Sequence, residues 1–286
     1  MPKRHPEPPE RLGEGPGQPC AMSAIRAAAA LLGPMRWHSQ VRVACVDASA
    51  MNTEVERKRL AGVPALLVRP VAAPGPLPTV LWFHGLAADK DVHLAELRRF
   101  AATGLLAVGV DAVGHGERRL VDFEQQFACS PEDSLPLFKS LVARTVDEVP
   151  ALIDALIEGG LADGGRIAVA GVSMGGCIVY GAVPSDRRLC AAVALMGSPE
   201  RTQPGPYTLA DERFFPTALL SITAERDSIV PPAAAEALHE RLAPRYASAP
   251  DRLCHQTIAG APHFMSAEDW ECAVAAACGW LVRFVL

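Results

Sequence analysis

A serine within a glycine-rich pentapeptide is the residue of this sequence best suited to covalent chemistry. The letters G-V-S-M-G occupy 171–175, after the apolar run RIAVAG at 166–171 and before a helical stretch at 177–183. In the pattern G-x-S-x-G, the serine lies on a sharp turn from a strand into a helix, and the glycines leave room for that turn. The helix start directs N–H groups toward the serine. A packing turn around an uninvolved serine is the alternative, but the flanking elements favour Ser173 as a nucleophile.

An aspartate and a histidine follow Ser173 in the order that a catalytic triad on such a turn requires. A serine hydroxyl is a poor nucleophile until a base takes its proton. Asp227 follows the apolar run TALLSIT at 217–223, and His263 follows the later run CHQTIAG. On this kind of scaffold, the acid and the histidine each lie at the carboxyl end of a strand later in the chain than the one before the nucleophile. We therefore expect His263 to be the general base and Asp227 to hold it.

The acid and the histidine also have plainer interpretations. Taken alone, Asp227 is a turn-forming residue and His263 is a histidine of a surface loop. Glu225 is a competing acid, because it lies two residues before Asp227. We place Asp227 first since it lies farther past the end of the predicted strand.

Two backbone N–H groups are predicted to stabilise the negative charge that forms on a reacting carbonyl oxygen. One comes from the residue after the nucleophile and the other from the loop after an early strand. Met174 follows Ser173, and Leu86 follows the run TVLWFHG at 79–85. We predict Met174 and Leu86 as the oxyanion donors, with His84 as a structural residue that fixes the loop.

Short apolar runs alternate with helical patterns from about residue 41 onward, which is typical of βαβ units and a mostly parallel sheet. An opening antiparallel pair of strands is predicted at 41–47 and 63–70. Residues 134–159 carry a long helical period, in which Pro150 either kinks the helix or begins a second one. The other predicted elements are strands at 79–85, 105–111, 166–171, 189–196, 217–223 and 254–260 and helices at 91–103 and 267–285.

Three segments make up the predicted domain organisation. Residues 1–21 are rich in proline, glycine and charge, so they are predicted to be a disordered leader. Residues 22–40 are predicted to form an N-terminal helix and linker, and residues 41–286 one α/β domain. Met22 is a candidate for the natural start of the protein.

Composition argues against several classes of protein. The formal net charge of −5 argues against binding to nucleic acid or to an anionic membrane surface. Eight scattered cysteines without a C-x-x-C pair or a Cys/His cluster argue against a zinc site, and in a chain of this size they favour reduced cytoplasmic thiols over disulfides. The sequence holds no apolar run as long as a membrane-spanning helix and no cofactor motif.

These residues together resemble the α/β-hydrolase superfamily, most closely its small bacterial carboxylesterases and its serine-aminopeptidase-like or dienelactone-hydrolase-like members. The resemblance covers about residues 41–286, and it implies an eight-stranded, mostly parallel sheet flanked by helices. It also implies Ser173, Asp227 and His263 as the triad. The motifs that carry it are HGLAADK (84–90), DAVGHGER (111–118), GVSMGG (171–176), ERDSIVP (225–231) and GAPHF (260–264).

Many members of this superfamily carry a cap domain, and the corresponding interval is short in this chain. Residues 197–216 are too few to form a full cap. A partial lid is predicted from residues 118–140. Its aromatic side chains Phe123, Phe127 and Phe138 either line an acyl pocket or pack the helix onto the sheet.

The expected activity is hydrolysis of small, short-acyl esters through an acyl-serine intermediate, without a metal or cofactor. The expected partner is a small-molecule ester, and the oligomeric state is left open. The same triad also fits a peptidase, a thioesterase or a lactone hydrolase. Outside the enzymes, the alternatives are a non-catalytic binding module on this fold and a scaffold protein that uses the proline-rich leader.

Overall fold

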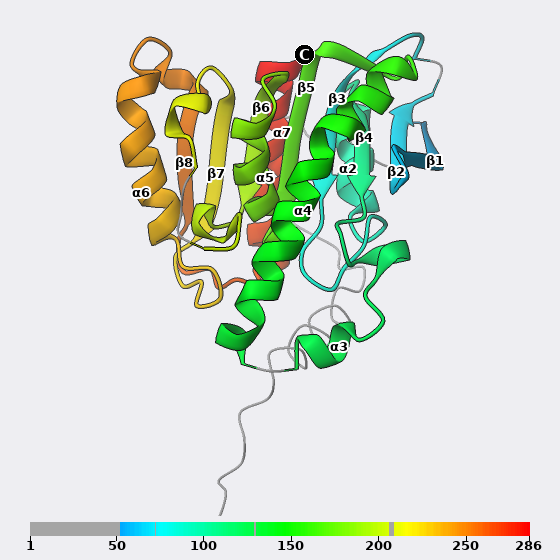
Figure 1. Ribbon diagram of the computed structural model, residues 1–286. Helices are drawn as coiled ribbons and strands as arrows, with labels where there is room; N and C mark the ends of the chain where they lie inside the picture. Colours follow the sequence, from blue (N-terminus) through cyan, green and yellow to red (C-terminus); the bar gives the residue numbers. More distant parts are fainter. Residues whose placement is uncertain (1–51, 72, 129, 206–208) are drawn as a thin grey trace, which may run out of the picture.

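The computed structural model describes residues 52–71, 73–128, 130–205 and 209–286 (Figure 1). The predicted leader (1–21), the N-terminal helix and linker (22–40) and the predicted strand at 41–47 lie outside these residues. The strands are β1 (Thr53–Leu60), β2 (Val63–Pro70), β3 (Leu77–Phe83), β4 (Leu106–Val110), β5 (Ala162–Val172), β6 (Leu189–Leu195), β7 (Ala218–Ala224) and β8 (Leu253–Ile258). The α-helices are α2 (Leu94–Ala102), α3 (Phe123–Gln126), α4 (Pro131–Glu158), α5 (Met174–Ser185), α6 (Ala233–Leu242) and α7 (Ala267–Val285).

One eight-stranded sheet runs through the described residues in the order β1-β2-β4-β3-β5-β6-β7-β8. β2 pairs antiparallel with both of its neighbours, whereas the pairs from β4–β3 to β7–β8 are parallel. The carboxyl ends of β3 and of β5 to β8 therefore meet at one edge of the sheet. The predicted α/β-hydrolase architecture is confirmed.

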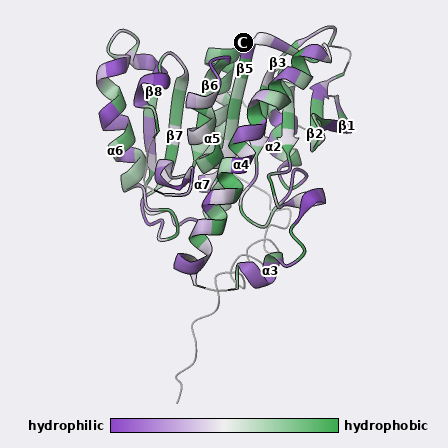
Figure 2. Cartoon of the chain, in the orientation of Figure 1, coloured by the Kyte–Doolittle hydropathy of each residue, from purple (hydrophilic) through white to green (hydrophobic). Residues whose placement is uncertain are grey.

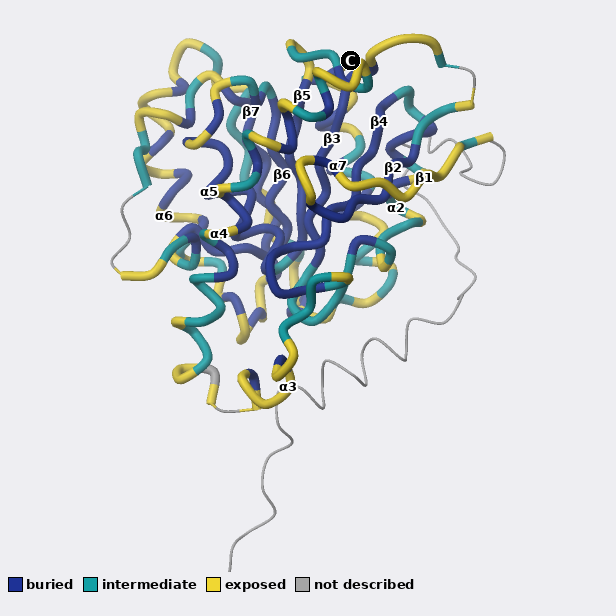
Figure 3. Tube along the Cα trace, turned by 45° about the vertical axis from the view of Figure 1, so that its right-hand side comes forward, coloured by how far each residue is buried: buried dark blue, intermediate teal, exposed yellow. Residues whose placement is uncertain are grey.

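Helices cover both faces of this sheet. α4, α5 and α6 pack on one face, and α2 and α7 pack on the other (Figure 1). Because both faces are covered, β3 and β7 are buried along their whole length rather than on alternate residues. The hydrophobic residues accordingly concentrate in the central strands (Figure 2), which form the buried interior of the molecule (Figure 3).

The first strand differs from the prediction. The described neighbours of β2 are β1 on one side and β4 on the other, whereas its predicted partner at 41–47 lies outside the described residues. β1 has the sequence TEVERKRL, and most of its side chains are exposed. An edge strand of this kind needs no apolar face, and its charges disfavour pairing with another chain. The pattern of apolar residues therefore could not reveal it.

Helix α4 is continuous and includes both Pro136 and Pro150. The alternative in which Pro150 begins a second helix is therefore wrong. The helix starts at an N-cap, Ser130, whose hydroxyl accepts a hydrogen bond from the Asp133 N–H at 3.2 Å. Among the described helices, none is both long and apolar enough to cross a membrane.

Candidate active site

Ser173 occupies the turn between β5 and α5 and has a strained backbone, with φ of 57° and ψ of −110°. Positive φ is uncommon for a residue with a side chain and persists only where the surroundings enforce it. Here the Ser173 N–H donates to the Leu195 carbonyl at 2.8 Å, and the Ser173 carbonyl accepts from the Cys177 N–H at 3.0 Å. Because β5 lies between β3 and β6, the serine is held at the carboxyl end of a central strand.

Glycines flank Ser173 because the backbone of β3 passes very close to the start of α5. A Cβ at Gly175 would overlap the carbonyl oxygen of Phe83. A Cβ at Gly171 would lie 2.7 Å from the carbonyl carbon of Gly175, far inside van der Waals contact. The glycines of the pentapeptide are therefore required by backbone contacts across three elements.

Replacement of Gly175 by alanine is expected to lower the free energy of unfolding by about 3 kcal/mol or more, because a backbone carbonyl cannot move aside cheaply. Gly279 in α7 is a matched control, since nothing lies within 4 Å of a Cβ built there. Its replacement by alanine should stabilise the protein by up to about 1 kcal/mol through helix propensity. Urea unfolding of the two variants measures the difference, and equal stabilities would contradict this account of the turn.

The three residues predicted as a triad form one hydrogen-bonded chain. His263 Nε2 lies 3.0 Å from Ser173 Oγ, and His263 Nδ1 lies 2.6 Å from Asp227 Oδ2. The other carboxylate oxygen of Asp227 accepts from the N–H groups of Ile229 and Val230 at 2.9 and 2.7 Å. With Nδ1–H donating to the carboxylate, Nε2 is free to accept the serine proton. Asp227 and His263 are buried, whereas Ser173 is partly exposed.

Glu225, the competing acid, does not contact His263. Its Oε2 accepts a hydrogen bond from the Gly260 N–H at 2.5 Å. Asp227 is therefore the acid that the structure places against the imidazole, in agreement with the order of preference from the sequence.

The loop after β3 lies against the serine. A Cβ built on Gly85 would be 3.8 Å from Ser173 Cβ, and Leu86 is the next residue along the loop. His84 holds this loop: its Nδ1–H donates to the Gly85 carbonyl at 2.8 Å, and its Nε2 accepts from the Ala112 N–H at 3.1 Å. Burial lowers the pKa of His84 to about 4, so the ring is neutral and can both donate and accept. The structural role predicted for His84 agrees with these contacts.

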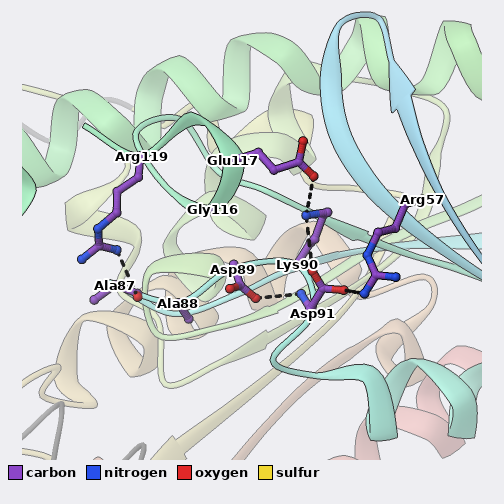
Figure 4. Close-up of a pocket in the computed structure, with 9 residues that line it drawn as sticks. All are labelled: Arg57, Ala87, Ala88, Asp89, Lys90, Asp91, Gly116, Glu117 and Arg119. Atoms are coloured by element: carbon purple, nitrogen blue, oxygen red, sulfur yellow. Dashed lines mark hydrogen bonds and ion pairs between the residues drawn. The ribbon is translucent and has the colours of Figure 1, made fainter. Parts of the chain in front are cut away.

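A cavity of about 390 Å³ lies beside the same loop (Figure 4). The Lys90 side chain in its wall is only 4 % exposed, and its Nζ lies 2.8 Å from Glu117 Oε1 and 3.3 Å from Asp111 Oδ2. Burial opposes the charged form of Lys90, but the hydrogen bonds and charges of these carboxylates outweigh it and raise the pKa of the ammonium group. The residues that line the cavity are Arg57, Ala87, Ala88, Asp89, Lys90, Asp91, Gly116, Glu117 and Arg119.

Sequence reasoning missed this network, because a lysine after the loop is equally compatible with an exposed charge. Asp111 accepts from the Lys90 N–H at 2.8 Å and from the Glu117 N–H at 2.9 Å, so its buried carboxylate ties the loops after β3 and β4 together. The sequence offered one signal for this network, which is that an acid, Asp111, directly follows the apolar run in LLAVGVD at 105–111.

The aromatic residues of the predicted lid pack together. Phe123 and Phe127 are buried, with ring centroids 4.7 Å apart. Phe138 is partly buried against the same cluster, and so is Leu86 of the loop after β3. These rings therefore pack beside the loop after β3, whereas their roles in a partial lid and in lining an acyl pocket stay predictions.

In the part of the chain that the structure describes, no group of three or more His, Cys, Asp or Glu side chains is arranged to hold a metal ion.

Comparison with known proteins gives two curated relatives that are esterases by name. YitV of Bacillus subtilis (strain 168) is 33% identical over 147 residues, which are 51% of this chain and 55% of YitV. YjfP of Escherichia coli (strain K12) is 27% identical over 175 residues, which are 61% of this chain and 65% of YjfP. The chain therefore spans just over half of the length of YitV and slightly less than two thirds of the length of YjfP.

A solved structure of similar size shares the fold. The crystal structure of TT1662 from Thermus thermophilus superposes with a TM-score of 0.63 at 25% identity, covering 81% of this chain and 99% of that one. The model of the dienelactone hydrolase family matches residues 63–251, about two thirds of the chain. That span contains Ser173 and Asp227, and His263 lies just beyond it. The chain belongs to the dienelactone hydrolase family, within the α/β-hydrolase superfamily.

Proposed function

We propose that this protein is a serine hydrolase that cleaves carboxylic esters through an acyl intermediate on Ser173. The observation that carries the proposal is the continuous chain from Ser173 Oγ through His263 to Asp227, with contacts of 3.0 and 2.6 Å. Nucleophile, base and orienting acid within hydrogen-bond reach are the arrangement that activates a serine. The esterase names of YitV and YjfP support the same bond type.

In the first half of the reaction, Ser173 Oγ attacks the ester carbonyl carbon while His263 Nε2 takes the hydroxyl proton. The carbonyl oxygen becomes an oxyanion, which the N–H groups of Leu86 and Met174 stabilise. Asp227 stabilises the imidazolium that forms. The bond from carbon to the alcohol oxygen then breaks, and His263 returns its proton to the leaving alcohol.

In the second half, water replaces the alcohol. His263 takes a proton from the water as its oxygen attacks the acyl carbon, and the same two N–H groups hold the second oxyanion. The bond to Ser173 Oγ breaks, the carboxylic acid leaves, and the serine recovers its proton from His263. No redox or cofactor step is needed to balance this sequence.

Small, short-acyl esters are the proposed substrates. The interval 197–216 is short, and Phe123 and Phe127 bury their rings against each other, which supports a small acyl site. We also propose that the protein acts in the cytoplasm. The free thiols of Cys177, Cys190 and Cys254 are compatible with a reducing compartment.

A panel of p-nitrophenyl esters from acetate to dodecanoate tests the proposal, with aminoacyl p-nitroanilides assayed beside it. We expect acetate to butyrate to be hydrolysed at least about a hundredfold faster than dodecanoate, and the anilides to be poor substrates. Faster release from the anilides would favour a peptidase. No turnover of esters, thioesters, lactones or anilides would contradict a hydrolase.

A further inference from the structure

The loops that carry Asp227 and His263 are joined to each other beyond the end of the sheet. The regular pairing of β7 with β8 ends at Ala224 and Ile258. Beyond it, the Glu225 N–H donates to the Ile258 carbonyl at 3.1 Å, and the Arg226 N–H donates to the Ala261 carbonyl at 2.9 Å. Two backbone hydrogen bonds therefore continue the contact between the strands toward the catalytic residues.

The Glu225 side chain adds a third hydrogen bond between the two loops. Its Oε2 accepts from the Gly260 N–H at 2.5 Å, across a sequence separation of 35 residues. Gly260 has a positive φ of 69° and begins the turn that leads to His263 three residues later. A hydrogen bond from a backbone N–H to a carboxylate is stronger than one to a neutral oxygen. This bond holds the start of the His263 turn.

We propose that Glu225 is a positioning residue, which sets the place of the His263 imidazole through Gly260. The inference rests on the function proposed above for His263. Asp227 needs no such help, because two backbone N–H groups already hold its Oδ1. The histidine must receive a proton from Ser173 across 3.0 Å, and misplacement by a fraction of an ångström lowers the rate of such transfers.

Glu225 cannot itself be the acid that orients the imidazole. The oxygen that reaches the neighbouring loop is bonded to Gly260, and Nδ1 of His263 is bonded to Asp227. Removal of Glu225 should therefore loosen the turn of the histidine without removing any member of the triad. This separates its effect from the loss of Asp227.

Three variants test the proposal: Glu225→Ala, Glu225→Gln and, as a control, Glu240→Ala. Glu240 is an exposed carboxylate in α6, away from both loops. Glu225→Ala should lower kcat about tenfold with little change in KM, since the substrate contacts are kept. Glu225→Gln should recover most of the rate because its amide oxygen can accept the same N–H. Glu240→Ala should match the parent.

A second measurement does not depend on turnover. The Nδ1 proton of His263, bonded to Asp227, is followed as a downfield proton NMR resonance, and hydrogen exchange is followed in a peptide spanning residues 259–266. Glu225→Ala should broaden the resonance and raise exchange, and Glu225→Gln should restore both. Unchanged NMR and exchange in Glu225→Ala would overturn the positioning role, whether or not the parent hydrolyses esters. A parent without esterase activity but with these spectral changes would overturn only the proposed function.

Discussion

The variant Ser173→Ala is expected to lose at least about a thousandfold in kcat/KM for p-nitrophenyl acetate, which is the loss typical of a missing triad nucleophile. Within the described part of the chain, the side-chain hydrogen bond that this variant loses is the one between Ser173 Oγ and His263 Nε2. The fold around the turn should stay intact, because the hydrogen bonds of Ser173 to Leu195 and Cys177 are made by its backbone. Full activity in this variant would place the nucleophile elsewhere.

A glycine at the same position provides an informative control. Ser173→Gly should be equally inactive, but it should be more stable than Ser173→Ala by about 1 kcal/mol, because glycine adopts a φ of 57° without strain. Thermal unfolding of the two variants measures the difference. If alanine proves as stable as glycine, the backbone strain inferred at the nucleophile is wrong.

Acidification is expected to destabilise the protein steeply below about pH 6.5, through three buried histidines. Burial lowers the pKa of His84 and His115 to about 4 and that of His239 to about 3, each from an ordinary value of 6.5. A positive charge on His84 further lowers the pKa of His115, and one on His255 further lowers that of His239. The folded protein then binds fewer protons than the unfolded chain, so stability falls as the pH falls.

The size of this loss follows from the pKa differences. At about pH 5 each of the three histidines costs about 2 kcal/mol, and together they cost about 6 kcal/mol, close to the whole stability of many domains. Urea unfolding between about pH 7.5 and pH 5 measures the change. Stability that stays flat across this range would show that the three rings are not held neutral by the fold.

His239→Gln isolates one of these contributions. His239 Nε2 lies 2.7 Å from Ser221 Oγ, which also accepts from the Tyr180 hydroxyl at 2.7 Å. A glutamine amide can keep the contact with Ser221 and does not titrate. The variant should match the parent within about 1 kcal/mol at about pH 7.5 and exceed it by about 2 kcal/mol at about pH 5, apart from any packing cost.

Elements with a strong apolar pattern could be predicted from the sequence, and weakly patterned ones could not. The strands β3, β4, β6 and β7, and β5 from Ile167 onward, are buried on both faces, so each appears as a largely apolar run between turn residues. β1 has exposed charged residues on both of its faces, so its sequence shows no apolar run. Pro150 does not end α4, because an internal proline can be tolerated when tertiary packing holds the helix.

The candidate triad was accessible from the sequence for a simple physical reason. Parallel strands place their carboxyl ends at one edge of the sheet, so residues that directly follow β5, β7 and β8 are brought together wherever they lie in the chain. Order and spacing were therefore enough to select Ser173 and His263, and to narrow the acid to Asp227 or Glu225 with Asp227 preferred. The close approach of the β3 backbone to the start of α5 could also be expected, because Gly171 and Gly175 have no Cβ that would prevent it.

What the sequence by itself determined is the sheet, the turn that holds Ser173 and the residues expected around it, since these depend on local pattern and chain order. Only the tertiary structure decided between Asp227 and Glu225, because their difference lies in which neighbour each carboxylate reaches. It also decided that Lys90 is buried among carboxylates and that Phe123 packs on Phe127. Side-chain partners far apart in the chain are set by how the loops fold over one another, and no local pattern encodes that.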